Sequence, residues 1–476
     1  MTEFGAILRV GVHVPKLRIA RSVIAAAMAW AIPPGRSVPS GARAICNWDE
    51  DSLTMAVEAA RSCAAGASPQ SIVLCSTTAP FADRDNAIVL AAALDLPDSI
   101  EALNLGASLR AGTSGFINAA RGACRTAALL VASDARLTRA GSPQEATYGD
   151  GAAALLLGPS SPTALATVLA ARSVASDFVD HYRMSGANFD YALEERWVRD
   201  ELLLRMPNVV AELLAEANIR SDAVRHFAVP TGTATAKRLA EACGLQTARR
   251  DERVLAECGD AGVALPLLLL AGALEAAAPG DLIVMIGIGQ GVDAVLLRAE
   301  AGVREGGPVL ADALARKRDE SCYVRYLSHR GLLDVDFGMR AERDQRTAHT
   351  VAYRKREALS AFKGGRCERC GAVQFPLSRV CVNPDCRASD TQRPHRLADS
   401  RGRVKSFTED WQAFASRPPY LYGNVEFAEG GNLLMEFTDL MSGELKVNDT
   451  VRFVYRIKDE DGTRGFRRYF WKATTA

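Results

Sequence analysis

Apolar and polar residues follow two alternating patterns along the first 300 residues of the chain. Short runs rich in Val, Ile and Leu recur between longer stretches in which apolar residues have helical spacing. A run that is apolar throughout predicts a strand buried on both faces, and such strands between helices predict a large α/β fold. The predicted strands are 71–76, 125–133, 151–158, 226–230, 281–289 and 293–299, and the predicted helices are 49–65, 85–96, 111–123, 195–217, 233–243 and 262–276.

The longest apolar run is AGVALPLLLLAGALEAAA, which starts at Ala261. It contains Pro266 and Glu275 and is shorter than the roughly 20 apolar residues that span a bilayer. We therefore expect a buried helix and no membrane segment. The N-terminal stretch MTEFGAILRVGVHVP lacks a basic segment followed by a long apolar run, so no secretory signal is expected.

The pattern changes after residue 300. From 301 to 365 the chain is rich in Arg, Asp and Glu, as in DALARKRDE and RAERDQRT, which leaves open a solvated connecting segment or a strap packed on the first domain. After residue 400, alternation of apolar and polar residues between glycine-containing turns predicts an antiparallel barrel or sandwich of about five strands, OB-like in its spacing. The stretches concerned are GRVKSFTED, YLYGNVEFAEGGNLLMEFTD, LKVNDTVRFVYRI and RGFRRYFWKA.

Aromatic side chains are frequent in this last region. They would either stack on a base or adenine, or form the core of the small barrel, and the core interpretation is favoured because so small a barrel needs them. The residues are Phe407, Trp411, Phe414, Tyr420, Tyr422, Tyr469, Phe470 and Trp471.

Composition narrows the class of protein. Of the 476 residues, 48% are hydrophobic and 24% charged, which indicates a globular protein with ample cores. The formal net charge of +1 gives no electrostatic reason to expect nucleic acid or an anionic membrane as partner. Eleven cysteines, most of them scattered, do not form a secreted disulfide framework, so we expect a cytoplasmic protein.

Four cysteines are clustered in CERCGAVQFPLSRVCVNPDC. Their spacing, C-x2-C-x10-C-x4-C, lets four sulfurs converge on one tetrahedral ion, and nearby glycine and proline residues supply turns. The alternative is four unrelated buried thiols. We predict a structural zinc ion, with no open coordination position, held by Cys367, Cys370, Cys381 and Cys386.

Six motifs carry a family resemblance. In chain order they are GVHVPKLRI, CSTTAPFA, SLRAGTSGF, YGDGAAALLLG, ECGDAGVALPLLLLAGALEAAAPGD and GIGQGVDAVLL. They resemble the thiolase superfamily, and within it 3-hydroxy-3-methylglutaryl-CoA synthase and ketoacyl synthase III. The C-terminal part resembles the rubredoxin-like zinc ribbon and OB-fold domain that accompanies such enzymes as a separate acyl-CoA-associated subunit.

The resemblance implies a thiolase-like five-layered αβαβα fold of two similar halves, a homodimer through this domain, and a tunnel for an acyl-CoA. A thiolase is a possible further partner. The expected domains are two thiolase-like halves, a charged connecting segment, a zinc ribbon and an OB-fold domain. Their expected bounds are 1–160, 161–300, 301–365, 366–400 and 401–476.

The family's nucleophilic cysteine is missing from the turn SLRAGTSGF. Aligning Gly112 and Thr113 with the family's Cys-x-x-Gly-Thr puts Leu109 at the nucleophile position, and leucine cannot be acylated. The adjacent Ser108 is either a substitute nucleophile or an N-cap of the following helix. We expect Gly112 and Thr113 to contact the substrate, because they let the helix start close to the sheet with its amides pointing at a carbonyl.

The other two catalytic groups of the family are missing as well. Thr77 aligns with the catalytic glutamate, and the catalytic histidine aligns with Ala228 or Thr231. His226 lies nearby, and its place in the strand predicts an edge or surface histidine.

A few polar residues remain as acid or base candidates. Asp260 is either a proton-transfer group with a raised pKa or a helix cap. His181 and Glu195 lie in the segment that forms part of the pocket in the resembling synthases, and each is otherwise a solvated side chain. GIGQG leads into a strand and not a helix, which disfavours a dinucleotide site. The resemblance implies instead that Gly289 and Gly291 approach the reacting carbonyl.

Three functional hypotheses follow. The first is an enzyme that makes or breaks a carbon–carbon bond in a CoA thioester, by Claisen or aldol chemistry, without an acyl-cysteine. The second is a non-catalytic subunit that binds or channels acyl-CoA for a thiolase. The third is an acyl-cysteine enzyme with a displaced nucleophile, for which Cys75, Cys124 and Cys258 are the candidates. The first is favoured because the scaffold is kept while the nucleophile is lost.

Overall fold

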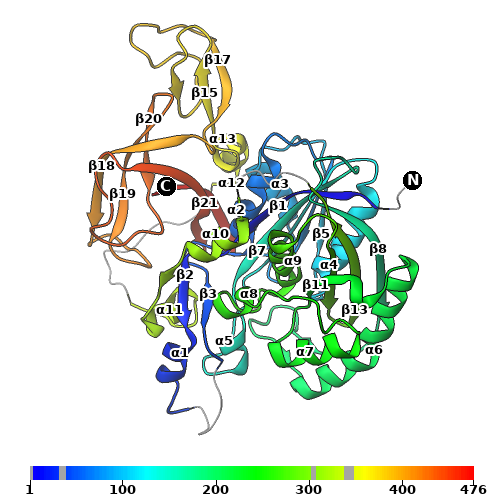
Figure 1. Ribbon diagram of the computed structural model, residues 1–476. Coiled ribbons are helices and arrows are strands. Elements are labelled where there is room, and N and C mark those ends of the chain that lie inside the picture. Colours follow the sequence, from blue (N-terminus) through cyan, green and yellow to red (C-terminus); the bar gives the residue numbers. More distant parts are fainter. Residues whose placement is uncertain (1–3, 32–38, 302–306, 337–347, 476) are drawn as a thin grey trace. The chain divides into compact units, whose positions relative to one another are not determined.

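The computed structural model describes residues 4–31, 39–301, 307–336 and 348–475 (Figure 1). The chain forms two compact units. The larger unit comprises residues up to Cys46, Asp51–Ile88 and Asp98–Tyr326, and the smaller unit comprises Asn47–Glu50, Val89–Pro97 and the chain from Leu327 onward. None of the helices in the described ranges is both long and apolar enough to cross a membrane.

A nine-stranded mixed sheet forms the centre of the larger unit. Its strand order is β11-β12-β13-β8-β1-β7-β6-β4-β5. The strands are β1 (Ala6–His13), β4 (Ser71–Cys75), β5 (Glu101–Leu105), β6 (Ala128–Asp134), β7 (Gly151–Gly158), β8 (Ala166–Ala175), β11 (Val224–Ala228), β12 (Leu282–Ile288) and β13 (Gly291–Ala299).

The sheet repeats one pairing pattern in its two halves. In the first half β1 pairs antiparallel with β7, β7 antiparallel with β6, and β6 parallel with β4. The second half repeats this order: β8 pairs antiparallel with β13, β13 antiparallel with β12, and β12 parallel with β11. The halves meet where β1 pairs with β8, and β5 extends the first half beyond β4. The prediction of two similar halves is confirmed.

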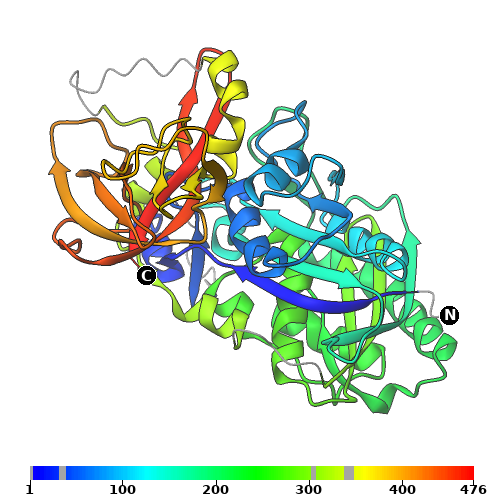
Figure 2. The ribbon, with the colours of Figure 1, turned by 90° about the horizontal axis from the view of Figure 1, so that it is seen from above.

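Helices cover the sheet on both faces and also fill the space between its halves. Helix α2 (Ser52–Ala64) contacts β1, β6 and β7, and α6 (Glu195–Glu216) contacts β8 and β13. Helices α4 (Ala111–Gly122) and α9 (Leu265–Ala276) contact strands of both halves, and they contact each other (Figures 1 and 2). Helix, half-sheet, central helices, half-sheet and helix therefore form the five predicted layers.

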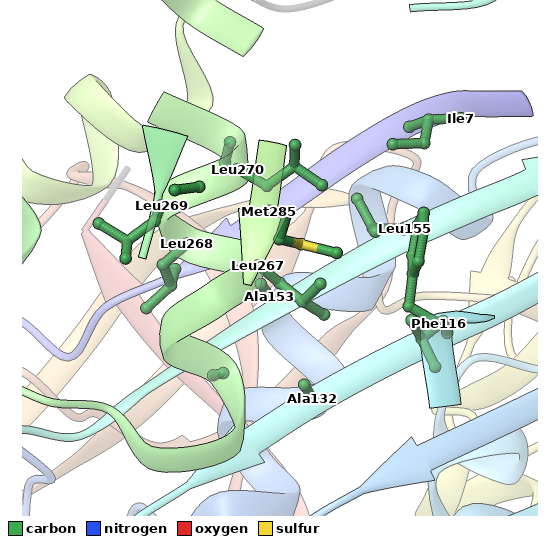
Figure 3. Packing of buried hydrophobic residues seen from close by; sticks show 14 of the residues in the cluster. Ile7, Phe116, Ala132, Ala153, Leu155, Leu267, Leu268, Leu269, Leu270 and Met285 are labelled. Atoms are coloured by element: carbon green, nitrogen blue, oxygen red, sulfur yellow. The ribbon is translucent and has the colours of Figure 1, made fainter. Parts of the chain in front are cut away.

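The two central helices are held by an apolar core (Figure 3). Every residue of α9 from Leu265 to Leu274 is buried, so the longest apolar run is the buried helix that was predicted. Phe116 of α4, Leu155 of β7 and Met285 of β12 belong to the same cluster. Full burial of one such side chain contributes about 1.5–3 kcal/mol, which explains why this helix tolerates no polar face.

All six predicted strands and six predicted helices are present, with shifted ends. The predicted helices at 85–96 and 233–243 are α3 (Asn86–Ala93) and α7 (Thr233–Ala242), and α9 is preceded by a short 3-10 turn, η2 (Gly262–Ala264). Strands β1, β5 and β8 were not predicted. Further elements of the larger unit are β2 (Leu17–Ala20), α1 (Arg21–Ala27), β3 (Ala42–Ile45), α5 (Pro143–Thr147), β9 (His181–Tyr182), β10 (Tyr191–Ala192), η1 (Ser221–Ala223) and α8 (Arg253–Glu257).

The charged segment 301–365 is divided between the two units. Helix α10 (Val309–Ala315) packs against α9 and β1, and β14 (Arg318–Asp319) pairs with β2, so this first part is a strap on the larger unit. Helix α11 (Tyr323–His329) leads into the smaller unit, which holds α12 (His349–Arg354) and α13 (Arg356–Ser360). The motif RAERDQRT lies outside the described residues.

The smaller unit contains two antiparallel sheets. The first joins β15 (Lys363–Cys367), β16 (Val373–Gln374) and β17 (Gln392–Arg396). The second has the order β20-β19-β18-β21-β22 and confirms the five predicted strands, while the OB-like topology and the finer domain bounds stay predictions. Its strands are β18 (Arg401–Asp410), β19 (Tyr420–Phe427), β20 (Asn432–Glu436), β21 (Thr450–Asp461) and β22 (Phe466–Thr475).

Aromatic rings form the core of the smaller unit. Phe362 is fully buried and lies 5.4 Å from the ring centroid of Phe453 and 6.2 Å from that of Trp471. Tyr469 and Trp471 are buried, as the core interpretation predicts, but Trp411 is 65% exposed. The core interpretation is therefore wrong for Trp411.

Candidate functional site

The turn that would carry a nucleophile is folded against the core. Ala107 has a φ of +67°, a left-handed conformation that turns the chain sharply before α4 begins at Ala111. The half-buried side chain of Leu109 packs against the central apolar cluster. Ser108 Oγ accepts a hydrogen bond from the Arg110 amide at 3.2 Å, but the N-cap of α4 is Arg110, so Ser108 does not cap the helix, and its role as a nucleophile stays a prediction.

The glycine loop between β12 and β13 lies directly against this turn. The Ser108 hydroxyl donates to the carbonyl of Gly289 at 3.3 Å. Gly289 has a φ of +147°, and a Cβ there would lie 2.7 Å from Ser108 Oγ and 3.1 Å from the Arg110 nitrogen. A Cβ on Gly287 would lie 1.8 Å from Thr113 Oγ1. Loop and turn therefore approach as closely as they do only because these positions lack side chains.

Asp134, the last residue of β6, accepts a hydrogen bond from the hydroxyl of Thr77. The Asp134 carboxylate is fully buried and accepts from the Thr77 amide at 2.8 Å and from Thr77 Oγ1 at 2.9 Å. It also accepts from the hydroxyls of Ser76 and Thr78 and from the amide of Val263, which precedes α9. Thr77 thus serves as a donor to a buried anion and cannot replace the base that aligns there.

Asp260 lies in a second charged group. Its carboxylate pairs with Arg136 at 2.9 Å and accepts from the Gly262 amide at 2.9 Å, while the N-cap positions of η2 and α9 are Ala261 and Ala264. The Arg136 guanidinium lies 3.5 Å from the centroid of the Tyr148 ring, and the Tyr148 hydroxyl donates to Asp190 at 2.7 Å. Burial raises the pKa of Tyr148, so this hydroxyl keeps its proton. Asp260 is therefore not the N-cap of either helix, and proton transfer by Asp260 stays a prediction.

The segment 176–193 contacts several parts of this region. Strands β9 and β10 pair antiparallel within it. Asp190 accepts from Tyr148, Arg183 donates to the Thr77 carbonyl, and the Ser176 amide donates to the Gln290 carbonyl of the glycine loop. The segment 176–193 therefore connects the Thr77 position, the Asp260 group and the glycine loop.

His181 belongs to the segment 176–193 and is half-buried. Its Nδ1 lies 3.1 Å from Asp180 Oδ2, a pairing that orients the ring. Asp180 and the Gly289–Gly291 loop line one hollow of about 20 Å³, which has room for roughly one water molecule. His181 is thus placed one residue from the hollow, whereas Glu195 begins α6, is exposed, and accepts from Thr235 of α7.

The remaining sequence candidates are His226 and three cysteines, of which Cys124 is half-buried and donates to the Arg121 carbonyl at 3.0 Å. His226 is on the edge strand β11, as predicted, but it is only 3% exposed and pairs with Asp281, so the surface alternative is wrong. Burial raises the pKa of Cys75 and of Cys258 to about 12. Thiols in that state are protonated at neutral pH and are poor nucleophiles, which weighs against the displaced-cysteine hypothesis.

The four clustered cysteines of the smaller unit converge. Their Sγ atoms all lie within 4.8 Å of one another, with 3.9 Å between Cys367 and Cys386 and 3.5 Å between Cys370 and Cys381. Four sulfurs at about 2.3 Å from one tetrahedral ion would be about 3.8 Å apart, so the cluster fits a zinc ion. The Thr391 hydroxyl, 3.2 Å from Cys367 Sγ, lowers the pKa of that thiol.

Comparison with known proteins bears on both units. A hydroxymethylglutaryl-CoA synthase from Aeropyrum pernix is 28% identical over 341 residues, which are 68% of this chain and 94% of that protein. One from Pyrococcus furiosus is 25% identical over 354 residues, 70% of this chain and 94% of that protein. The chain is homologous to hydroxymethylglutaryl-CoA synthases. A DUF35 domain-containing scaffold protein from Methanothermobacter thermautotrophicus is also homologous, with 28% identity over 112 residues, 23% of this chain and 82% of that protein.

Solved structures confirm the thiolase-like fold. The synthase MvaS in complex with 3-hydroxy-3-methylglutaryl coenzyme A has a TM-score of 0.60 at 17% identity, covering 70% of this chain and 93% of that one. FabH from Pseudomonas aeruginosa, a 3-oxoacyl-(acyl carrier protein) synthase III, has a TM-score of 0.53 at 21% identity, covering 63% and 99%. No protein-family model matches the chain.

The structure also shows groups that sequence reasoning missed in this synthase homologue. Asp134, Arg136, Tyr148 and Asp190 form the contacts around Thr77 and Asp260, and Asp293 accepts hydrogen bonds from the first turn of α4. One available signal was position, because Asp134 directly follows a predicted strand of an α/β sheet, where ligand-facing residues tend to lie.

Proposed function

We propose that the larger unit binds a CoA thioester and makes or breaks a carbon–carbon bond without an acyl-cysteine intermediate. The observation that carries this proposal is the packing of Leu109 into the core at the aligned nucleophile position, while the turn and glycine loop around it keep their close approach. Homology to hydroxymethylglutaryl-CoA synthases over 68% of the chain supports a thioester as substrate. The acyl-CoA would place its carbonyl beside Leu109, where the turn meets the loop.

Aldol chemistry needs no covalent intermediate at this site. In the cleavage direction a base removes the proton of the β-hydroxyl group, the Cα–Cβ bond breaks, and a carbonyl product leaves an enolate of the CoA thioester. Protonation at Cα then gives the acyl-CoA, and the reverse sequence forms the bond. Amides at the start of α4, together with the helix dipole, would stabilise the enolate oxygen. Asp260 and His181 are the proposed proton carriers, Ser108 is a weaker candidate, and Gly112, Thr113, Gly289 and Gly291 would contact the substrate.

The experiment is an incubation of the purified protein with a β-hydroxyacyl-CoA, and separately with an acyl-CoA and a carbonyl acceptor. Chromatography of the CoA products should show turnover, and the intact mass of the protein should show no acyl adduct. Turnover that disappears in Asp260→Ala would support the assigned proton carrier. Absence of turnover with any acyl-CoA, alone or with proteins encoded beside it, would exclude the enzyme. An acyl adduct on Cys75, Cys124 or Cys258 would favour the displaced-cysteine hypothesis instead.

A second candidate is a non-catalytic subunit that binds or channels acyl-CoA for a thiolase. It is favoured by the loss of all three aligned catalytic groups and by homology to a protein named as a scaffold. In that case acetyl-CoA would bind to the purified protein without turnover, and adding the partner thiolase would restore a complete reaction. Turnover by the protein alone would exclude it.

We further propose one structural zinc ion held by Cys367, Cys370, Cys381 and Cys386.

We also propose a cytoplasmic homodimer. The dimer would form through β5, which is the last strand of the sheet and in which Leu103 is 51% exposed. We expect the mass of Leu103→Lys in solution, measured by light scattering, to be half that of the wild type. The zinc ribbon, OB-fold and connecting segment keep the proposed bounds 366–400, 401–476 and 301–365.

A further inference from the structure

A fully buried carboxylate lies at the start of α4. Asp293 is the third residue of β13 and directly follows the glycine loop. Its two oxygens accept hydrogen bonds from four side chains: Arg110 Nη1 at 3.1 Å, Thr113 Oγ1 at 2.9 Å, Ser114 Oγ at 2.7 Å and Ser173 Oγ at 2.5 Å. Arg110 Nη1 also donates to Ser173 Oγ and to the Val174 carbonyl, both at 3.2 Å, and Thr113 Oγ1 also donates to the Arg110 carbonyl at 3.0 Å. Asp293 is the acceptor that all four donors share.

Three of the four donors belong to the turn and to the first turn of α4. Arg110 directly follows Leu109, and Thr113 and Ser114 lie on the helix that begins at Ala111. The fourth donor, Ser173, lies on β8 and not on the turn. Asp293 therefore connects the start of α4 to the strand that leaves the glycine loop.

The glycine positions already lie in close contact with the start of α4. A Cβ on Gly287 would lie 1.8 Å from Thr113 Oγ1, and a Cβ on Gly289 would lie 3.1 Å from the Arg110 nitrogen. The hydrogen bonds thus act on surfaces already at van der Waals contact, so a small displacement of the helix start changes the gap beside Leu109. Misplacement by about 1 Å in such a gap is enough to cost roughly 100-fold in rate.

We infer that Asp293 is a positioning residue, which holds the Ser108–Arg110 turn against the Gly289–Gly291 loop in the geometry that receives the thioester carbonyl. The inference rests on the proposed function for its ligand, but the placement of the turn can be measured without any activity. Asp293 acts through the side chains of Arg110, Thr113 and Ser114, and it does not itself contact substrate.

A thiol placed in the turn reports on this geometry. In Leu109→Cys, the alkylation rate of the introduced thiol by iodoacetamide is followed against pH, with peptide mass spectrometry to separate it from the native cysteines. Adding Asp293→Asn removes a negative charge and loosens the turn. We expect faster alkylation at neutral pH and a midpoint lower by about one pH unit. Identical profiles with and without Asp293→Asn would overturn the inference.

Matched hydroxyl variants separate positioning from general stability. Ser114→Ala removes a donor to Asp293 on α4 and should raise the alkylation rate. Thr167→Val removes a donor on β8 to a different carboxylate, Glu300, and should leave the rate unchanged. Equal effects of the two would contradict the inference. Asp222→Asn, at an exposed pair with Arg220, is the control for loss of a surface carboxylate. Circular dichroism of every variant establishes that it is folded, and the Ser114 and Thr167 variants still decide if Asp293→Asn does not fold.

Thioester binding provides the second readout. We expect the dissociation constant for acetyl-CoA, measured by calorimetry, to rise roughly tenfold or more in Asp293→Asn and in Ser114→Ala, and to stay unchanged in Thr167→Val. If the wild type does not bind acetyl-CoA, the proposed function fails, while the alkylation profiles still decide whether Asp293 places the turn.

Discussion

The cysteine cluster of the smaller unit and the candidate site of the larger unit draw their residues from very different lengths of chain. All four cysteines fall within 367–386, and their sulfurs meet within 4.8 Å. The candidate site instead combines residues from the ends of strands and the starts of helices, and the Asp134 carboxylate alone joins Thr77 to Val263. The first arrangement is specified by local spacing, and the second exists only when the five layers are assembled.

This difference predicts how each region responds to a single substitution. A metal site shares one ion among all its ligands, so loss of one ligand removes the energy of the whole site. The candidate site distributes its energy over many hydrogen bonds between separate elements, so a substitution there removes only its own share. The predictions below test this contrast, beginning with the largest effect.

Loss of one cluster cysteine should abolish zinc binding and unfold the chain around it. Binding of structural zinc contributes about 10–16 kcal/mol in small zinc domains at neutral pH, far more than a small sheet such as β15-β16-β17 gains by packing. We expect elemental analysis to give one zinc per wild-type chain and less than half of that for Cys381→Ala. Limited proteolysis should then cut within 363–396.

Cys322→Ala is the matched control for this substitution, because Cys322 is exposed and lies outside the cluster. It should retain zinc and resist proteolysis like the wild type. Zinc retention by Cys381→Ala, or a zinc-free wild type that remains resistant, would contradict the assignment of a structural metal site.

Asp134→Ala should have the next largest effect, on the free energy of unfolding. The substitution leaves the hydroxyls of Thr77 and Thr78 and the Val263 amide without their acceptor, and it removes a buried negative charge close to Arg136. Deleting one side of such a buried network costs about 3–5 kcal/mol. Urea unfolding followed by circular dichroism measures the loss. Asp222→Ala, at an exposed position, should leave the free energy of unfolding nearly unchanged, and equal losses would contradict the network.

The same contrast explains which features the sequence could predict. Strands such as β4, β7 and β12 are apolar because both faces are buried, and α9 is apolar all round because it lies between the half-sheets. These apolar runs can be recognised from the sequence alone. Strand β5 was missed because it lies at the exposed edge of the sheet, where EALNL has no continuous apolar run.

The candidate site was only partly predictable for a related reason. The glycine loop and the turn were found as motifs, and the cysteine spacing gave the whole cluster. Asp134, Tyr148 and Asp293 were missed because their importance comes from partners far along the chain, such as Asp293 with Thr113, 180 residues away. A single sequence contains no record of such pairings, since each member alone looks like an ordinary polar residue.

Gly289→Ala should affect binding more than stability. A φ of +147° and the close approach to the turn leave no room for a side chain, whereas Gly280, with a φ of +91°, has open space around a built Cβ. Both substitutions should cost about 1–3 kcal/mol of stability through backbone strain. Only Gly289→Ala should also abolish acetyl-CoA binding measured by calorimetry. Loss of binding in Gly280→Ala would show that strain alone, without the turn, explains the effect.

The smallest effects should separate two glutamates on α6. Glu201 lines the hollow beside the glycine loop and pairs with Arg205, whereas Glu195 is exposed and accepts a hydrogen bond from Thr235. Glu195→Ala should leave stability and acetyl-CoA binding unchanged within about 0.5 kcal/mol, because substitutions at such surface sites seldom do more. Glu201→Ala should weaken binding measurably, since Arg205 would then turn an unpaired charge toward the loop. A strong effect of Glu195→Ala with none of Glu201→Ala would move the candidate site away from the hollow and restore Glu195 as its acid or base.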